Sequence, residues 1–136
     1  MKNIKSIAGV ALLAMMATTS HAAKSVTVGE LQGFTGPLES MIGAMSGGAN
    51  LAVTEANASG KFLQGTINVV QGDSVCIDPA VAIAQAEKMV NEDNVMAIMG
   101  PNCSGNTIAV IEGVIVPNGI VSISPSATSP AIDALD

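Results

Sequence analysis

The chain has 136 residues, a formal net charge of −6 at pH 7, and 49% hydrophobic against 12% charged residues. This balance is typical of a folded globular domain and argues against a disordered chain. The acidic charge excludes a protein that binds nucleic acid or an anionic membrane through a basic surface. Phe34 and Phe62 are the only aromatic residues, so a pocket built from this chain has no tyrosine or tryptophan to stack on a ligand.

Residues 1–22 have the pattern of a cleaved secretory signal peptide. Lys2 and Lys5 give a basic start, an apolar stretch covers 7–17, and small residues stand at Ser20 and Ala22, where a signal peptidase would read them. The stretch is too short to span a bilayer, and a retained signal-anchor helix is the alternative. We therefore expect a mature chain that begins at Ala23 and is exported.

Removal of this leader would also remove His21, the only histidine. Catalysis by Ser-His-Asp or Cys-His sets and the commonest zinc sites all need histidine. A secreted hydrolase would also need a nucleophile-elbow turn, which the sequence does not have. The mature chain is therefore expected not to be an enzyme, and no metal or other cofactor is predicted.

The mature part alternates predicted strands with predicted helices. Residue alternation and short apolar runs indicate strands at 25–29, 66–70, 95–99 and 120–123. Apolar residues at three- and four-residue spacing, with an Asp-Pro start for the second helix, indicate helices at 38–56, 78–91 and 104–112. Gly43, Gly47 and Gly48 should weaken the first helix and let it lie close to a neighbouring backbone. The order predicts an α/β fold, a doubly wound parallel sheet with helices on both faces.

In open sheets of this kind, ligands bind beyond the carboxyl ends of the strands. The loops at those ends read LQGFTGP, QGDSVCIDP, GPNCSGNT and SPSATSP. Ser104 and the first amides of the third helix could hold a carboxylate without a lysine. The simpler interpretation, which the spacing favours, is that Ser104 only caps its helix. Hydroxyls and carbonyls of SPSATSP could receive an ammonium group, or the segment could be a proline-rich exit from the last strand.

Cys76 and Cys103 lie in two of these loops, 27 residues apart. In an oxidising compartment we expect them to form a structural disulfide, with two free buried thiols as the alternative. Closing such a loop stabilises the fold by roughly 3 kcal/mol. If the first strand lies between the second and third, the bridge must reach over a gap of about 10 Å.

The acidic side chains show no spacing that indicates a catalytic pair. Most of the five considered are expected to be exposed to solvent, and these five are Glu30, Glu39, Asp73, Asp78 and Glu87.

In combination, the motifs GFTGPL, DSVCIDP, MGPNCSG and SISPSATSP, with the helix GGANLAVTEANASG, resemble those of the periplasmic branched-chain amino acid binding proteins. These are the solute receptors of ABC importers. The resemblance covers essentially the whole mature chain and implies the fold of a type I periplasmic binding protein. It implies a disulfide between Cys76 and Cys103 and a contact from Ser104 to the ligand's α-carboxylate. It also implies contacts from Ser126 and Thr128, with Ala127 between them, to the α-ammonium and α-carboxylate.

Members of that family have two lobes joined by hinges, and the resemblance places residues 23–136 in the N-terminal part of lobe 1. It implies a monomeric, non-enzymatic receptor in the periplasm that binds the α-amino-acid head group and delivers the solute to an ABC permease in the inner membrane. Leucine, isoleucine, valine, another amino acid, an amide or urea all stay open as ligands, because the side-chain pocket lies beyond this segment. A ligand-sensing ectodomain on the same fold is the alternative, and a transmembrane helix downstream would indicate it.

Overall fold

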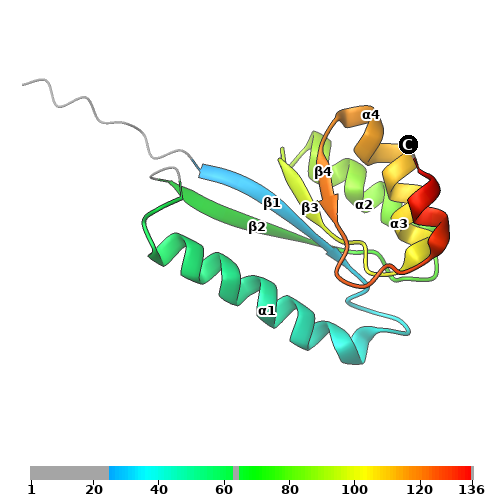
Figure 1. Ribbon diagram of the computed structural model, residues 1–136, viewed down its shortest axis with the longest axis horizontal. Coiled ribbons are helices and arrows are strands. Elements are labelled where there is room, and N and C mark those ends of the chain that lie inside the picture. Colours follow the sequence, from blue (N-terminus) through cyan, green and yellow to red (C-terminus); the bar gives the residue numbers. More distant parts are fainter. Residues whose placement is uncertain (1–24, 63–64, 136) are drawn as a thin grey trace, which may run out of the picture.

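The computed structural model describes residues 25–62 and 65–135, so the predicted signal peptide lies outside the described residues. Strands and helices alternate along the chain (Figure 1). Their bounds are β1 (Ser25–Gln32), α1 (Glu39–Ala58), β2 (Thr66–Asp73), α2 (Pro79–Asn91), β3 (Ala97–Met99), α3 (Ser104–Val110), η1 (Ile111–Ile115), α4 (Val116–Asn118), β4 (Val121–Ile123) and η2 (Pro130–Ala134). Across the described ranges, no helix combines the length and the apolar character that a membrane crossing needs.

The strands form one parallel sheet in the order β2-β1-β3-β4. β1 pairs with β2 over its whole length, and the stretch from Val28 to Glu30 pairs with β3 on the other side. The predicted α/β class is confirmed. β1 and β2 continue beyond their predicted ends, to Gln32 and Asp73, so the loops that follow them are shorter than the sequence indicated. Because all pairs are parallel, the carboxyl ends of the strands meet at one edge of the sheet.

The hydrophobic core lies between the sheet and the pair α2 and α3. Leu31 and Ile98 of the strands pack there with Met89 of α2 and Val110 of α3, and none of the four is more than 1% exposed. Burying each such side chain contributes about 1.5–3 kcal/mol. α2 begins at the predicted place, because the Asp78 carboxylate accepts the amide hydrogen of Ala80 at 2.9 Å.

The third helix was predicted to end at Glu112, but the helical run continues through η1 and α4 to Asn118. Val114 and Ile115 are buried in the same core, and this burial outweighs the weak helix propensity of Gly113. The run ends at Gly119, whose φ of 63° lies in the left-handed region that glycine adopts without strain.

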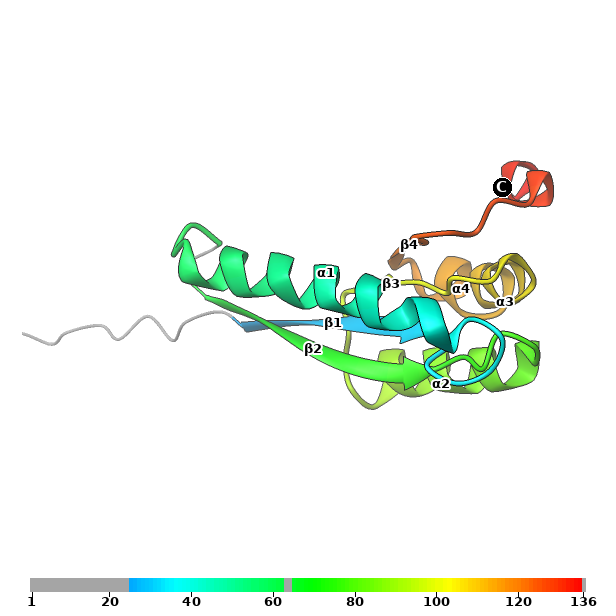
Figure 2. The same ribbon diagram turned by 90° about the horizontal axis from the view of Figure 1, so that it is seen from below.

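α1 lies along β2 on the opposite side of the sheet from α2 (Figure 2). Its last turn is fixed to the edge of the sheet, because the Asn57 side chain accepts the Ile67 amide hydrogen at 2.8 Å and donates to the Ile67 carbonyl at 3.0 Å. Nearer its middle, Gln71 of β2 donates to the Ser46 hydroxyl at 3.3 Å. Polar contacts therefore contribute much of the attachment of α1.

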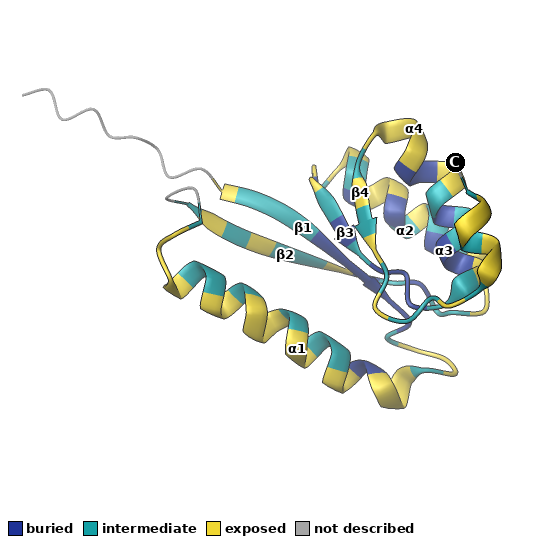
Figure 3. Ribbon diagram, viewed as in Figure 1, coloured by how far each residue is buried: buried dark blue, intermediate teal, exposed yellow. Residues whose placement is uncertain are grey.

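Apolar contacts under α1 are few, and Ile42 is its only buried residue (Figure 3). A Cβ atom added at Gly43, Gly47 or Gly48 would meet no atom within 4 Å. The prediction that these glycines bring the helix close to a neighbouring backbone is therefore wrong for the chain as described.

The sheet face on the α1 side is apolar beyond the reach of α1, where Val28, Ala97, Met99 and Ile123 line a shallow hollow. Glu30 points to the same face, since Leu31 next to it points into the core. The expectation of solvent exposure is wrong for Glu30, which is 1% exposed. Its two carboxylate oxygens accept hydrogen bonds from Gln32 at 2.6 Å and Gln71 at 2.8 Å.

Candidate functional site

The predicted disulfide is present and connects two loops at the carboxyl edge of the sheet. It joins Cys76, between β2 and α2, to Cys103, between β3 and α3, with Cα atoms 5.5 Å apart. β1 lies between β2 and β3, so the bridge passes over the end of β1. A Cβ atom at Gly33, the first residue after β1, would lie 3.3 Å from the Cβ of Cys76. Glycine at this position therefore leaves the room that the crossing needs.

Ser104 is the first residue of α3 and lies half-buried at this edge. The N-cap residue of α3 is Cys103, without a side-chain cap, so the interpretation that Ser104 only caps its helix is wrong. Its Oγ accepts the amide hydrogens of Thr128 at 3.1 Å and Ser129 at 3.2 Å. A hydroxyl that accepts two hydrogen bonds still has its own O–H to donate. Within 25–62 and 65–135, no acceptor for that O–H is recorded.

The segment Ser124–Ser129 forms a turn after β4, which we call the β4 turn. The Ser126 hydroxyl donates to the Asn102 carbonyl at 2.8 Å, and the Ser124 hydroxyl donates to the Pro101 carbonyl. The Ser124 Oγ in turn accepts the Ala127 amide hydrogen at 2.9 Å. The segment 101–104 thus holds the β4 turn at several points.

The structure therefore brings the predicted ligand residues together. Ser104 and Thr128 are neighbours through a hydrogen bond, Ser126 and Ala127 are half-buried, and Thr128 is exposed. Sequence reasoning missed Ser124 and Asn102, whose hydrogen bonds hold the β4 turn in place. Ser124 stands inside the SPSATSP motif, whereas nothing in the spacing marked Asn102. The hydroxyls and amides gathered here can offer hydrogen-bond donors to an anion and acceptors to a cation.

At the end of β2, the Asp73 carboxylate connects the loops after β1 and β2. It accepts the Thr35 hydroxyl hydrogen at 2.6 Å, the Thr35 amide hydrogen at 3.3 Å and the Val75 amide hydrogen at 2.9 Å. Partial burial alone would raise the pKa of Asp73, but these hydrogen bonds outweigh it and hold the pKa below its ordinary value. The carboxylate therefore keeps its charge and its fixed position at neutral pH.

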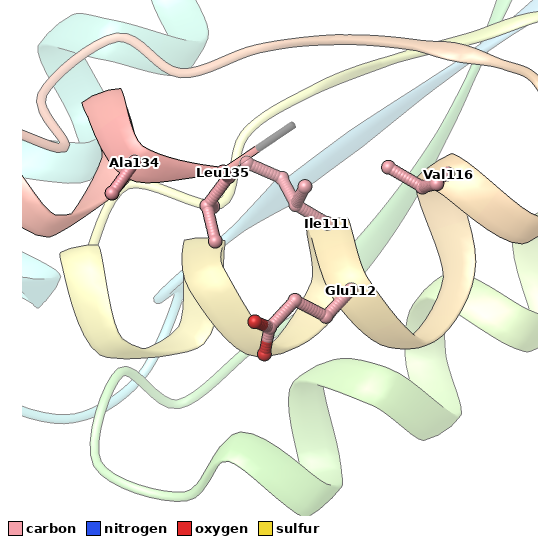
Figure 4. A pocket seen from close by; sticks show the side chains of 5 residues that line it. All are labelled: Ile111, Glu112, Val116, Ala134 and Leu135. Atoms are coloured by element: carbon pink, nitrogen blue, oxygen red, sulfur yellow. The ribbon is translucent and has the colours of Figure 1, made fainter.

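A separate pocket of about 290 Å³ lies away from this edge (Figure 4). It is formed where the last described turn runs beside the long helical run, and it is lined by Ile111, Glu112, Val116, Ala134 and Leu135. None of the predicted ligand residues contributes to it. For metals, the described part of the chain has no group of three His, Cys, Asp or Glu side chains that could hold an ion.

Curated relatives match most of this chain. An amino acid binding protein of Pseudomonas aeruginosa is 32% identical over 128 residues, which is 94% of this chain and 34% of that protein. A Leu/Ile/Val-binding protein of Escherichia coli K12 is 34% identical over 69% of this chain and 28% of its own length. The chain thus spans about a third of the length of these relatives.

Solved structures agree with the fold. The substrate binding protein of a branched-chain amino acid transporter of Streptococcus pneumoniae, in complex with isoleucine, is 32% identical and superimposes with a TM-score of 0.75. That match covers 82% of this chain and 31% of the other. A solute binding protein of an ABC transporter of R. palustris, in complex with 4-hydroxybenzoate, is 22% identical with a TM-score of 0.71 over 82% of this chain and 29% of the other, and it shows the shared fold.

The family model for "periplasmic binding protein" matches residues 25–134, which is nearly all of the described chain. Proteins of this family bind solutes for transport and are not enzymes. The fold, the relatives and this match agree, and the chain belongs to the periplasmic binding protein family.

Proposed function

We propose that this chain is the N-terminal part of the first lobe of a periplasmic solute receptor that serves an ABC importer. In this proposal residues 1–22 are a secretory leader, and residues 23–136 bind the α-amino-acid head group at the edge formed by Ser104 and the β4 turn. The observation that carries the proposal is the Ser104 hydroxyl, which accepts two amide hydrogens from the β4 turn and so keeps its O–H for a ligand. The receptor acts as a monomer and passes its solute to a permease in the inner membrane.

In the proposed complex the ligand's carboxylate lies at the start of α3. The Ser104 O–H and the Thr128 hydroxyl donate to it, together with the first amides of the helix, which have no partner inside the helix. A carboxylate is also favoured there by the positive end of the helix dipole. No lysine or histidine is required.

The ligand's ammonium group would lie against the β4 turn. The Ser126 hydroxyl already donates to the Asn102 carbonyl, so its oxygen is left as an acceptor. The Ala127 amide already donates to Ser124, so Ala127 offers its carbonyl oxygen. These neutral acceptors orient an ammonium group, and a charged partner for it would come from outside this segment.

Sequence similarity supports an amino acid over a simple carboxylic acid as the ligand in this proposal. The isoleucine-bound structure is more similar in sequence, at 32%, than the 4-hydroxybenzoate-bound one, at 22%, or a benzoate-bound one, at 24%. Isoleucine and benzoate share a carboxylate, but only isoleucine has an ammonium group. Comparing the affinities for isoleucine and benzoate therefore tests the ammonium-binding part of the proposed site separately from the carboxylate-binding part.

The test is calorimetric titration of isoleucine and of benzoate into the purified protein, in the full length that its gene encodes. Ser104→Ala should weaken isoleucine binding by about 1–3 kcal/mol, or roughly 5- to 150-fold, because the charged carboxylate loses a donor. An unchanged dissociation constant would remove Ser104 from the site. Tighter binding of benzoate than of isoleucine would overturn the proposed amino-acid preference.

Ser59→Ala is the matched control for this test. Ser59 also uses its hydroxyl in local contacts, as a donor to the Ala56 carbonyl at 2.7 Å and an acceptor from the Lys61 amide at 3.1 Å. It lies just after α1, at the opposite end of the sheet from Ser104, so its loss should leave the isoleucine affinity unchanged.

A further inference from the structure

Asn102 occupies an unusual position among the loops at the carboxyl edge. It is 2% exposed and lies in the loop between β3 and α3, directly before Cys103. Its Oδ1 accepts the amide hydrogen of Gly33, the first residue after β1, at 3.0 Å. Its own carbonyl accepts the Ser126 hydroxyl of the β4 turn at 2.8 Å. One residue thus connects the loops that follow three strands.

The segment 101–104 supplies hydrogen-bond partners to the β4 turn. Pro101 and Asn102 offer carbonyls to Ser124 and Ser126, and Ser104 offers its hydroxyl oxygen to the Thr128 amide. The position of the β4 turn therefore depends on the position of this segment. The Asn102 side chain fixes it to the end of the central strand β1 through Gly33.

Packing alone does not explain an asparagine at this position. The Nδ2 group of Asn102 is buried and has no hydrogen-bond partner among the residues that the structure describes. A buried donor without a partner is unfavourable, and an apolar side chain of similar size would avoid it. The useful part of the side chain is its oxygen, which holds the Gly33 amide.

We infer that Asn102 is a positioning residue for the proposed head-group site. By accepting the Gly33 amide hydrogen, it sets the orientation of its own carbonyl and of the segment 101–104. The carbonyl then holds Ser126, and the β4 turn brings the Thr128 amide to Ser104. The inference rests on the proposed function for the ligand, whereas the geometry of the turn can be tested without any ligand.

The test compares Asn102→Ala with Asn106→Ala in the full-length protein. Asn106 is a matched control, because it is 1% exposed and its side chain also connects α3 to another loop, by donating to the Ser74 carbonyl at 2.8 Å. Among the described residues, the Asn106 side chain makes no hydrogen bond to the β4 turn. Both variants should lower the melting temperature, since each loses a buried hydrogen bond.

Amide hydrogen exchange, measured by NMR, reads the turn directly. In Asn102→Ala the amides of Thr128 and Ser129 should exchange faster, because the turn that presents them to Ser104 is no longer held. In Asn106→Ala they should keep their protection. Ser126→Ala removes the next bond in the same series of contacts, from the Ser126 hydroxyl to the Asn102 carbonyl, so it should give the same signature if Asn102→Ala fails to fold.

Isoleucine titration gives the second readout. Asn102→Ala should weaken binding by about tenfold or more, and Asn106→Ala by much less. Equal effects of the two variants on exchange and on affinity, or no effect of Asn102→Ala and Ser126→Ala on the turn amides, would overturn the inference. If the unmodified protein does not bind isoleucine but the exchange pattern is as expected, the proposed ligand is wrong and the positioning role of Asn102 stands.

Discussion

At the scale of single residues, Asp73 shows how one carboxylate connects two loops at the binding edge. Its pKa is held below its ordinary value, because the hydrogen bonds from Thr35 and Val75 outweigh the effect of partial burial. A group whose pKa is lowered on folding stabilises the fold at pH values above its unfolded pKa, which is about 3.9. That contribution is lost as the pH falls through the lower, folded pKa.

Asp73→Asn should therefore lower the free energy of unfolding by about 1 kcal/mol at pH 7, since the charge-assisted bonds from Thr35 are weakened. The difference from the unmodified protein should begin to shrink as the pH falls below about 4, where the carboxylate of the unfolded chain becomes protonated, and it should disappear below the lower pKa of the folded state. Urea unfolding followed by circular dichroism at pH 7 and near pH 3 measures both values. In a Thr35→Val background the same substitution should cost less, and a full-sized effect there would contradict the role of Thr35.

Asp78 and Ser104 show which residue roles the sequence could predict. The cap by Asp78 was predictable, because its partner Ala80 lies two positions away and a following proline marks the helix start. The partner of Ser104 is the amide of Thr128, which lies 24 positions away and is brought near only by the fold. Local spacing therefore favoured a helix cap for Ser104, and only the resemblance to a known family indicated a role beside Thr128.

At the scale of elements, α1 and the run after α3 depart from prediction for the same reason. Helix propensity and glycine content are local properties, whereas burial depends on the rest of the fold. The run after α3 passes Gly113 because Val114 and Ile115 are buried. α1 was predicted from apolar residues at three- and four-residue spacing, yet Ile42 alone is buried in it.

The open surroundings of α1 give a prediction at this scale. Gly47→Ala should raise the free energy of unfolding by about 0.5–1 kcal/mol, because alanine restricts the unfolded chain and favours the helix. A Cβ atom at this position meets nothing within 4 Å. Thermal unfolding measures the gain, and a loss of stability would mean that the outer face of α1 is in contact with another part of the protein.

Gly100→Ala is the opposite control. Gly100 has a φ of 116°, and a Cβ atom there would collide with the Leu31 carbonyl oxygen. The backbone of β1 cannot move aside without disturbing the core around Leu31, which is fully buried. This variant should therefore be strongly destabilised in the same assay.

At the scale of the whole molecule, the sequence predicted the parallel α/β class because strands and helices alternate at short, regular spacing. It left open the strand order, on which the path of the disulfide depends. With β1 between β2 and β3, the bridge between Cys76 and Cys103 passes close to Gly33, where a Cβ atom would lie 3.3 Å from the Cβ of Cys76. The alternation along the chain does not mark this use of Gly33, since the loop after β1 contains a second glycine, Gly36, and a turn alone would explain both.

The last prediction concerns that bridge. Replacing both cysteines, Cys76→Ser with Cys103→Ser, should lower the free energy of unfolding by about 3 kcal/mol, because the unfolded chain regains the freedom of a closed loop. The loop spans 27 residues and contains α2, so its release also loosens the helix that covers Leu31 and Ile98. Urea unfolding of the oxidised protein and of the double variant measures the difference, and a reducing agent should destabilise only the former. Free-thiol titration of the oxidised, unfolded protein should find no reactive thiol, whereas two reactive thiols would show that the bridge does not form and that the loops meet by packing alone.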